Sequence, residues 1–398
     1  MLPASIYQER RKKLSSILGD SPIVIAGFDA LQQTNDASAP FVQESNFFWL
    51  TGITEPGWQL VIASGKNILV SAAKTEIQRI FDGGLSADEA ILVSGVDLVI
   101  GKDELVSLLQ DTAKKSESVY TIFKHPSSKY FDFSLNPAPQ RVQKQLKGFF
   151  SEVIDCRKEL AKLKAIKSPK EIELIQEAID ISIDGFHKVY ESLKDARHEY
   201  EIEANLSYAF RSAGASGHAY EPIVGTGKNA CTLHYIENND PLPKNGMVLI
   251  DAGARVAGYA ADITRTYAVG VPSQREKAVH YEVEQAHKAV IDLIKPGYAF
   301  KEYSEAVDTI MKKALKNLGL LKTAEDYRKY FPHAISHGLG IDVHDSLGGF
   351  DAFQAGMVLT VEPGIYIPEE GIGVRIEDDI LVTEMGNENL SSALSTSL

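Results

Sequence analysis

Four acidic residues lie inside segments that otherwise have the composition of buried β-strands. Asp251 lies in VLIDAG, Asp262 in YAADITRTY, Glu362 in LTVEPG and Glu377 in VRIED. Ionised side chains are almost never fully buried unless they are paired. The fold must therefore supply partners for four acids at once, and no other feature of the sequence constrains the chain as strongly.

The acids fall two by two on two predicted strand pairs. One pair is expected over MVLIDAGARV and YAADITRTYAV, with a bend at Gly258 between them. The other is expected over MVLTVEPGIYI and VRIEDDILV, with a turn at residues 368–373. Both begin with Met-Val-Leu after a glycine, Gly246 or Gly356. The pattern indicates a duplicated unit whose two hairpins present acids from similar places.

Two explanations account for such acids. Each can form its own ion pair, for instance with Arg265 or Arg375. Alternatively the carboxylates converge, in which case they repel one another and a divalent cation removes that cost. The first explanation suits any single acid, but it is weak for four acids arranged in this way. The pattern therefore favours a metal site.

Histidines strengthen the prediction of a site. His333, His337 and His344 lie within PHAISHGLGIDVHD, beside glycines that permit close backbone approach, and His234 lies in Leu-His-Tyr. One imidazole with four carboxylates can hold two metal ions, and such a donor set favours Mn²⁺, with Zn²⁺, Co²⁺ and Fe²⁺ as alternatives. Two neighbouring ions activate water and polarise a carbonyl, which is the chemistry of amide or ester hydrolysis.

Composition and patterning indicate two α/β domains. The chain has 398 residues, and its first third alternates short apolar runs such as Ile23–Ala26 with helical patterns such as Tyr7–Leu18. A capping-box spacing at Ser168-Pro169 predicts a long amphipathic helix after it. We place the domain boundary so that residues 1–155 form the first domain and 156–398 the second.

Charge and cysteine content exclude several classes of function. The chain has 41 Lys and Arg against 54 Asp and Glu, a formal charge of −13, which disfavours nucleic-acid binding. Two cysteines cannot form a disulfide framework. Neither a secretory signal nor a membrane-spanning run is visible, so a cytoplasmic location and no membrane partner are expected. The polar C-terminal SSALSTSL is expected to fray.

Several motifs together resemble one enzyme family. IDAG…ADITRTY, SHGLGIDVHD, TVEPGIY and GVRIEDD are similar to the metallopeptidases of the pita-bread fold, in the branch of the Xaa-Pro aminopeptidases and prolidases. The segment FVQESNFFWLTGITEPG resembles the N-terminal domain of that branch. The resemblance implies an α/β (α+β) chain: a mixed α/β domain followed by a pita-bread domain with pseudo-twofold β-hairpins.

The resemblance also implies roles for individual residues. The metal ligands would be Asp251, Asp262, His337, Glu362 and Glu377. Asp262 and Glu377 would bridge two ions, and Glu362 would also carry the proton of the attacking water. His234 and His344 would contact the substrate and stabilise the tetrahedral intermediate. His333 would line a proline pocket with Tyr366, and Arg375 would orient carboxylates or bind substrate.

The implied function is hydrolysis of the bond between an N-terminal residue and proline, in a homodimer or homotetramer. The alternative is a dipeptidase, which would recognise the free carboxylate of an Xaa-Pro dipeptide. The loop Ser346–Gly356, where an arginine would serve that task, contains neither Arg nor Lys and favours the aminopeptidase. A non-catalytic peptide-binding module and a metal-free creatinase-like hydrolase are disfavoured because all five ligands are present.

Overall fold

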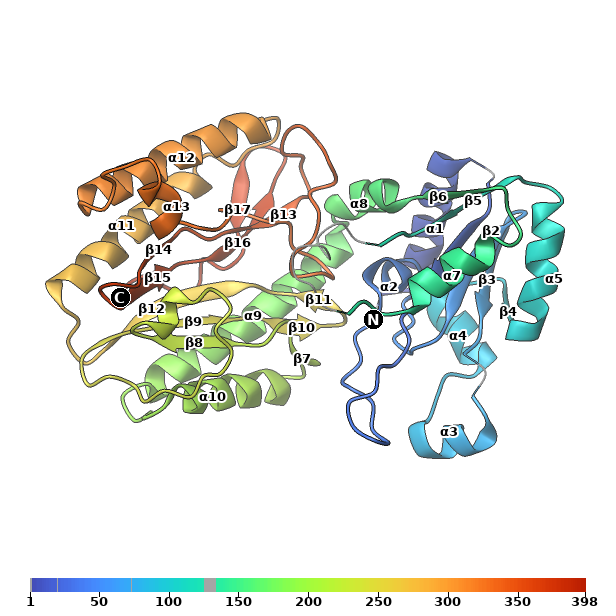
Figure 1. Ribbon diagram of the computed structural model, residues 1–398, viewed down its shortest axis with the longest axis horizontal. Coiled ribbons are helices and arrows are strands. Elements are labelled where there is room, and N and C mark those ends of the chain that lie inside the picture. Colours follow the sequence, from blue (N-terminus) through green and yellow to red (C-terminus); the bar gives the residue numbers. More distant parts are fainter. Residues whose placement is uncertain (1, 20, 73, 125–133) are drawn as a thin grey trace. The chain divides into compact units, whose positions relative to one another are not determined.

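The computed structural model describes residues 2–19, 21–72, 74–124 and 134–398, and its chain divides into two compact units (Figure 1). The units are Met1–Leu163 and Lys164–Leu398. Helix α8 (Arg157–Ala165) runs across this division. The boundary expected between residues 155 and 156 lies just before α8, and it stays a prediction.

The first unit is built on one mixed sheet in the order β4-β3-β2-β1-β5-β6. Strands β1, β2 and β3 pair antiparallel, whereas β4, β5 and β6 join the sheet in parallel. The strands are β1 (Ile23–Ala26), β2 (Gln59–Ala63), β3 (Lys66–Val70), β4 (Leu98–Ile100), β5 (Ser118–Thr121) and β6 (Glu152–Asp155). Parallel pairs require crossover connections, so helices must lie between these strands.

The helices of this unit are α1 (Ala4–Leu18), α2 (Ser45–Thr51), α3 (Glu76–Asp82), α4 (Ala87–Ser94), α5 (Lys102–Ala113) and α7 (Ala138–Leu146). Leu105 of α5 and Val142 of α7 share one apolar core with Val24 and Val119 of the sheet. The predicted mixed α/β character of the first third is confirmed.

The second unit begins with the long helix that the capping box predicts. Helix α9 (Pro169–Ser192) starts with Pro169 at its first position, and the Glu171 carboxylate accepts from the N–H and the hydroxyl of Ser168. Ile175, Ile179 and their neighbours on one face are buried. The other helices are α10 (Glu199–Ser212), the 3₁₀ turn η1 (Asn229–Cys231), α11 (Gln274–Ile291), α12 (Phe300–Asn317) and α13 (Asp326–Tyr330).

The strands of this unit form several short sheets between the helices (Figure 1). They are β7 (Gly217–His218), β8 (Ile223–Thr226), β9 (Gly246–Ala252), β10 (Ala254–Val256), β11 (Tyr259–Ala260), β12 (Ile263–Val269), β13 (Val358–Val361), β14 (Gly364–Ile367), β15 (Ile372–Arg375), β16 (Asp378–Val382) and β17 (Asn387–Asn389). Helix α9 packs on β10, β11 and β12, while α11 packs on β13, β14 and β15. Each predicted strand pair is thus covered by its own helix.

Both predicted strand pairs are present, and the second is interrupted. Strands β9 and β12 pair antiparallel along their whole length. The second pair consists of β13 with β16 and β14 with β15, and it breaks at Glu362-Pro363 on one side and Ile376-Glu377 on the other. Because proline has no N–H for a ladder, the break falls where Pro363 stands. It frees the backbone of Glu377 to bridge to Thr264 of the first pair.

The expectation of a frayed C-terminus is wrong. Ser391 and Leu394 are buried, and the fully buried Arg265 guanidinium donates to the carbonyls of Leu394 and Ser395. Arg265 also forms an ion pair of 2.6 Å with the buried Asp378 carboxylate. The C-terminal segment is held in place because its backbone carbonyls accept hydrogen bonds from the buried Arg265 guanidinium. The composition of the segment does not reveal these contacts. In the described parts of the chain, no helix combines the length and apolarity needed to cross a membrane.

A buried histidine beside this ion pair predicts a loss of stability in acid. Nε2 of His287 lies 3.4 Å from Asp378, and burial lowers the pKa of His287 from 6.5 to about 4 despite that carboxylate. Between pH 6.5 and 4 the unfolded chain binds a proton that the folded chain does not. The contribution of His287 to the free energy of unfolding should therefore fall as the pH falls, by up to about 3 kcal/mol.

His287→Gln should remove this part of the pH dependence in urea unfolding of the metal-free protein between pH 7 and 4. The matched control is His187→Gln, because His187 is exposed on α9 and should keep the wild-type slope. If the free energy of unfolding depended on pH in the same way in wild type and in His287→Gln, the assignment of this pH dependence to His287 would be wrong.

Candidate functional site

The two aspartates of the site are brought together by a close approach of their strands. Asp251 lies near the end of β9, and Asp262 lies between β11 and β12. Between them, the backbone of Gly253 packs so tightly that an added Cβ would overlap the carbonyl of Ala261. Both aspartates are buried. Glycine at position 253 is therefore required for the convergence of the two carboxylates.

The half-buried Tyr220 holds both aspartates and was not found from the sequence. Its hydroxyl lies 2.5 Å from Oδ1 of Asp251 and 2.6 Å from Oδ1 of Asp262. Burial and the two nearby carboxylates raise the pKa of Tyr220, so the hydroxyl stays a donor. The residue lies in the short connection between β7 and β8, which has no periodicity or motif, so no sequence signal marks it.

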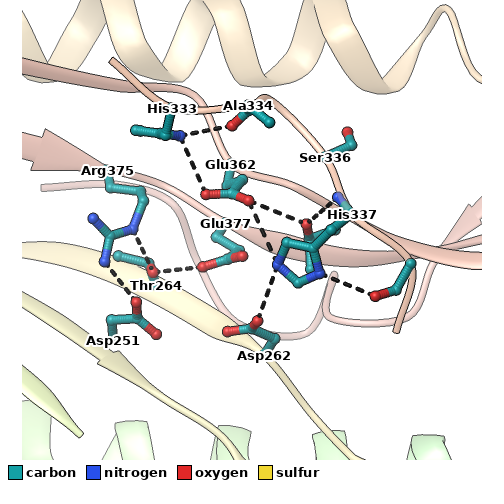
Figure 2. Close-up of polar contacts among 12 residues, drawn as sticks. Asp251, Asp262, Thr264, His333, Ala334, Ser336, His337, Glu362, Arg375 and Glu377 are labelled. Carbon is teal, nitrogen blue, oxygen red and sulfur yellow. Dashed lines mark hydrogen bonds and ion pairs between the residues drawn. The ribbon is translucent and has the colours of Figure 1, made fainter. Parts of the chain in front are cut away.

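The two glutamates come from the breaks in the second strand pair. Glu377 is fixed by Thr264, whose hydroxyl donates to Oε2 at 2.6 Å and whose carbonyl accepts from the Glu377 N–H. Glu362 follows β13, and its N–H donates to the carbonyl of Ile335. The breaks turn both glutamate side chains toward the aspartates of the first pair, as Figure 2 shows.

His337 is the fifth residue of the group and contacts an acid from each strand pair. Its Nε2 lies 3.4 Å from Oδ2 of Asp262 and 3.5 Å from Oε1 of Glu362. Its Nδ1 lies 3.0 Å from the carbonyl of Gly338. In the tautomer that donates from Nδ1, the Nε2 lone pair faces the carboxylates, which is how ligand histidines are oriented in metal sites.

The explanation by separate ion pairs holds for one acid only. Arg375 donates to Oδ2 of Asp251 at 2.5 Å. For Asp262, Glu362 and Glu377, no ion pair with lysine or arginine is found among the residues that the structure describes. Burial raises their pKa well above the ordinary range, and neighbouring carboxylates raise it further.

This arrangement fits divalent metal ions. Ligand atoms of Asp262, His337 and Glu377 all lie within 4.8 Å of one another. Asp251 and Glu362 face the same space (Figure 2). A divalent cation bound there would remove the repulsion between the carboxylates, and their oxygens with one imidazole are a suitable donor set. The structure thus brings together all five ligands implied by the resemblance.

Several of the remaining candidate residues contact the proposed ligands: His333 contacts Glu362, Arg375 contacts Asp251 and His344 contacts His337. Nε2 of His333 lies 2.9 Å from the Tyr366 hydroxyl, and that hydroxyl accepts a hydrogen bond from Arg375. Arg375 is buried, with Thr264 as its third partner, an arrangement that suits orienting carboxylates rather than direct substrate contact. The imidazole of His344 lies edge-on to that of His337, with ring centroids 4.3 Å apart.

His234 lies at an exposed position in a turn, and its charge acts on two of the other candidate histidines. After burial, the charge of His234 is the largest cause that lowers the pKa of His344, and it also contributes to the lowered pKa of His333. His333 further lines a cavity of about 370 Å³ between α12, α13 and the segment 333–336. His333 and His344 therefore contact candidate metal ligands, Glu362 and His337 respectively, while His234 acts on both of these histidines through its charge.

Comparison with known families decides where the chain belongs. Residues 173–384 match metallopeptidase family M24. The chain belongs to this family. Residues 7–121 match the N-terminal domain of aminopeptidase P. This match confirms the prediction that the chain is a metallopeptidase. It also confirms divalent metal ions as cofactors, but it does not identify the metal.

Individual relatives and structures agree with the family. The chain is 34% identical to the Xaa-Pro aminopeptidase of Haemophilus influenzae, over 99% of this chain and 95% of that protein. It is 33% identical to the Xaa-Pro aminopeptidase of Escherichia coli, over 98% and 94%. Aminopeptidase P from E. coli with the inhibitor Pro-Leu superposes with a TM-score of 0.87 at 30% identity, covering 100% of this chain and 96% of that one. The predicted pita-bread fold is confirmed.

Metal binding should stabilise this M24 chain through the acidic group. Adding Mn²⁺ at about 100 times its dissociation constant should raise the free energy of unfolding of metal-free protein by about 2.7 kcal/mol, because only the folded chain presents the site. Glu377→Gln should lose most of the accompanying rise in Tm. Glu370→Gln, at an exposed residue paired with Arg275, should keep it. An unchanged rise in Glu377→Gln would remove that residue from the site.

Proposed function

We propose that this chain is an Xaa-Pro aminopeptidase, which hydrolyses the bond between an N-terminal residue and a following proline. The observation that carries the proposal is the convergence of Asp251, Asp262, His337, Glu362 and Glu377 in a chain that matches Xaa-Pro aminopeptidases over nearly its whole length. The substrates would be peptides that begin with Xaa-Pro.

Each part of the site has a task in this reaction. Bound divalent ions, two in number and most suitably Mn²⁺, would supply an activated water and polarise the scissile carbonyl. Glu362 would take the proton of the attacking water and deliver it to the leaving proline nitrogen. His234 and His344 would hold the developing oxyanion.

Selection of proline would come from the aromatic wall beside Glu362. The His333 ring lies 5.0 Å from that of Phe331 and 5.5 Å from that of Tyr366, both edge-on. Proline has no amide N–H and a fixed φ, so a shaped apolar surface can distinguish it. Nδ1 of His333 lies 3.4 Å from Glu362, which would place the selected ring next to the proton carrier.

A dipeptidase is the second candidate, and one cation favours it. The loop Ser346–Gly356 has no cation for a substrate carboxylate, but Arg328 of α13 lines the same cavity as His333. Its Nη1 lies 3.5 Å from the carbonyl of His333, and the residue is exposed. A guanidinium in this place could bind the free carboxylate of an Xaa-Pro dipeptide. The homodimeric or homotetrameric state and the cytoplasmic location remain predictions.

Substrate length should separate the two candidates. Mn²⁺-loaded protein should cleave an Xaa-Pro-Xaa tripeptide with a kcat/KM at least equal to that for the Xaa-Pro dipeptide with the same first residue. The reason is that the short loop leaves no fixed cation to demand a carboxylate on proline. Preference for the dipeptide that is lost in Arg328→Met would instead identify a dipeptidase.

Removing His234 should affect the chemical step. His234→Ala should lower kcat by about 10²- to 10³-fold, because one oxyanion contact contributes on that order. The Mn²⁺-induced rise in Tm should persist, since His234 is outside the ligand group. His187→Ala is the control and should keep full kcat because that side chain is exposed on α9. An unchanged kcat in His234→Ala would exclude it from the reaction.

A further inference from the structure

The loop that carries His344 is closed at its base by the residue that follows this histidine. The N–H of Asp345 donates to the carbonyl of Gly338 at 2.8 Å, and these two residues form an isolated β-bridge. A Cβ at Gly338 would press against the carbonyl of Asp345, so the two chain segments touch. His337 and His344 thus lie next to the two residues that close this loop, Gly338 and Asp345. The bridge between these two residues therefore sets the distance between the two imidazole rings.

Two buried lysines hold the Asp345 side chain. Nζ of Lys167 lies 3.2 Å from Oδ2 of Asp345, and Nζ of Lys164 lies 3.5 Å from Oδ1. The side chains of Lys164, Lys167 and Asp345 are 6%, 2% and 4% exposed, so the whole group is removed from water. Lys164 also reaches the half-exposed Asp342 at 3.1 Å. The lysines come from the segment that precedes α9.

The lysine-bearing segment is itself fixed to the same unit. The N–H of Lys167 donates to the carbonyl of Gly356, and the N–H of Gly356 donates to Val382 of β16. The two ammonium groups are therefore anchored to the sheet that carries the acids of the second strand pair. Although burial opposes ionisation of Asp345, the two lysines outweigh it and lower its pKa.

Stability alone does not account for this cluster. Burying three charges costs more desolvation energy than a well-packed apolar group of the same volume, and buried ion pairs are often replaceable without loss of stability. What such a cluster supplies is a fixed geometry. A carboxylate held by two cations from one side and by the Ser346 N–H at 2.9 Å has little freedom to move. Because His344 precedes Asp345 in the chain, fixing Asp345 also limits the movement of the His344 backbone.

We propose that Lys164 and Lys167 are positioning residues that act through Asp345 to hold the His344 imidazole against His337 and the substrate. The proposal rests on the proposed function only for the role of His344 in catalysis. It assigns a task in the reaction to two lysines that lie before α9 and do not line the candidate metal site.

The test is a double-mutant cycle between Lys167→Met and His344→Ala on the full chain. Lys167→Met removes one cation but leaves Lys164 paired with Asp345, and circular dichroism checks that the fold persists. The variant should lower kcat at least 10-fold on an Xaa-Pro-Xaa tripeptide, with KM within 2-fold. In the His344→Ala background, Lys167→Met should cause no further loss, because coupled residues are not additive.

Controls separate this task from general packing. Lys170→Met, at an exposed lysine paired with Glu173, should leave kcat unchanged. Lys164→Met is the second variant and should follow the same cycle, so the test stands if Lys167→Met does not fold. The Mn²⁺-induced rise in Tm should persist in both variants. Equal losses with and without His344, or no loss at all, would overturn the proposal.

A measurement independent of turnover distinguishes failure of this inference from failure of the proposed function. Ring ¹H–¹⁵N resonances of His344, identified by their absence in His344→Ala, should shift in Lys167→Met and not in Lys170→Met. A wild-type protein that cleaves no Xaa-Pro peptide would refute the proposed function while leaving this result interpretable. Unshifted His344 resonances in both lysine variants would refute the positioning role.

Discussion

Mutual repulsion among buried carboxylates is the constraint on which the catalytic unit depends. Burial raises the pKa of Asp262, Glu362 and Glu377, and the neighbouring carboxylates, Asp251 among them, raise it further. Only a fold that fixes each acid independently can keep them close together. The structure does so by different means: a tyrosine hydroxyl for the two aspartates, an arginine for Asp251 and a threonine for Glu377. The polar partners hold the carboxylates in place, and a divalent ion then gains a site prepared for it.

The two classes of functional residue are supported differently. The acids lie on strands or in breaks between paired strands, where hydrogen bonds of the backbone restrict them. The accessory histidines lie on loops, where no such ladder exists. Loops can place a side chain accurately only if something else fixes them. For the loop of His344 this support is the ion cluster at Asp345. For the loop of His234 it is the fully buried Glu199, which accepts from the hydroxyl of Tyr235.

The sequence predicts those features that repeat or that contradict their surroundings. Acids among apolar residues indicated the site, and the two Met-Val-Leu segments indicated the paired strands. Tyr220 could not be predicted, because a tyrosine in an irregular segment is ordinary until its hydroxyl is seen between two carboxylates. The ion cluster was equally hidden, since Lys167 and Asp345 are separated by 178 positions and each alone reads as a surface residue. The prediction of a frayed C-terminus was wrong because the contacts of Leu394 and Ser395 are made by their backbone carbonyls, which have no sequence signature.

The ion cluster and the tail also define what a self-sufficient catalytic fragment must contain. The family match covers residues 173–384, which includes every proposed ligand and every accessory histidine. Yet Lys164 and Lys167 precede that range, and the carbonyls that accept from Arg265 follow it at Leu394 and Ser395. A fragment of residues 173–384 would contain the proposed ligands and accessory histidines. It would lack the lysines that hold Asp345 and the C-terminal carbonyls that bind Arg265. Excision of an autonomous peptidase from this chain would need to begin before Lys164 and retain the last residues of the tail.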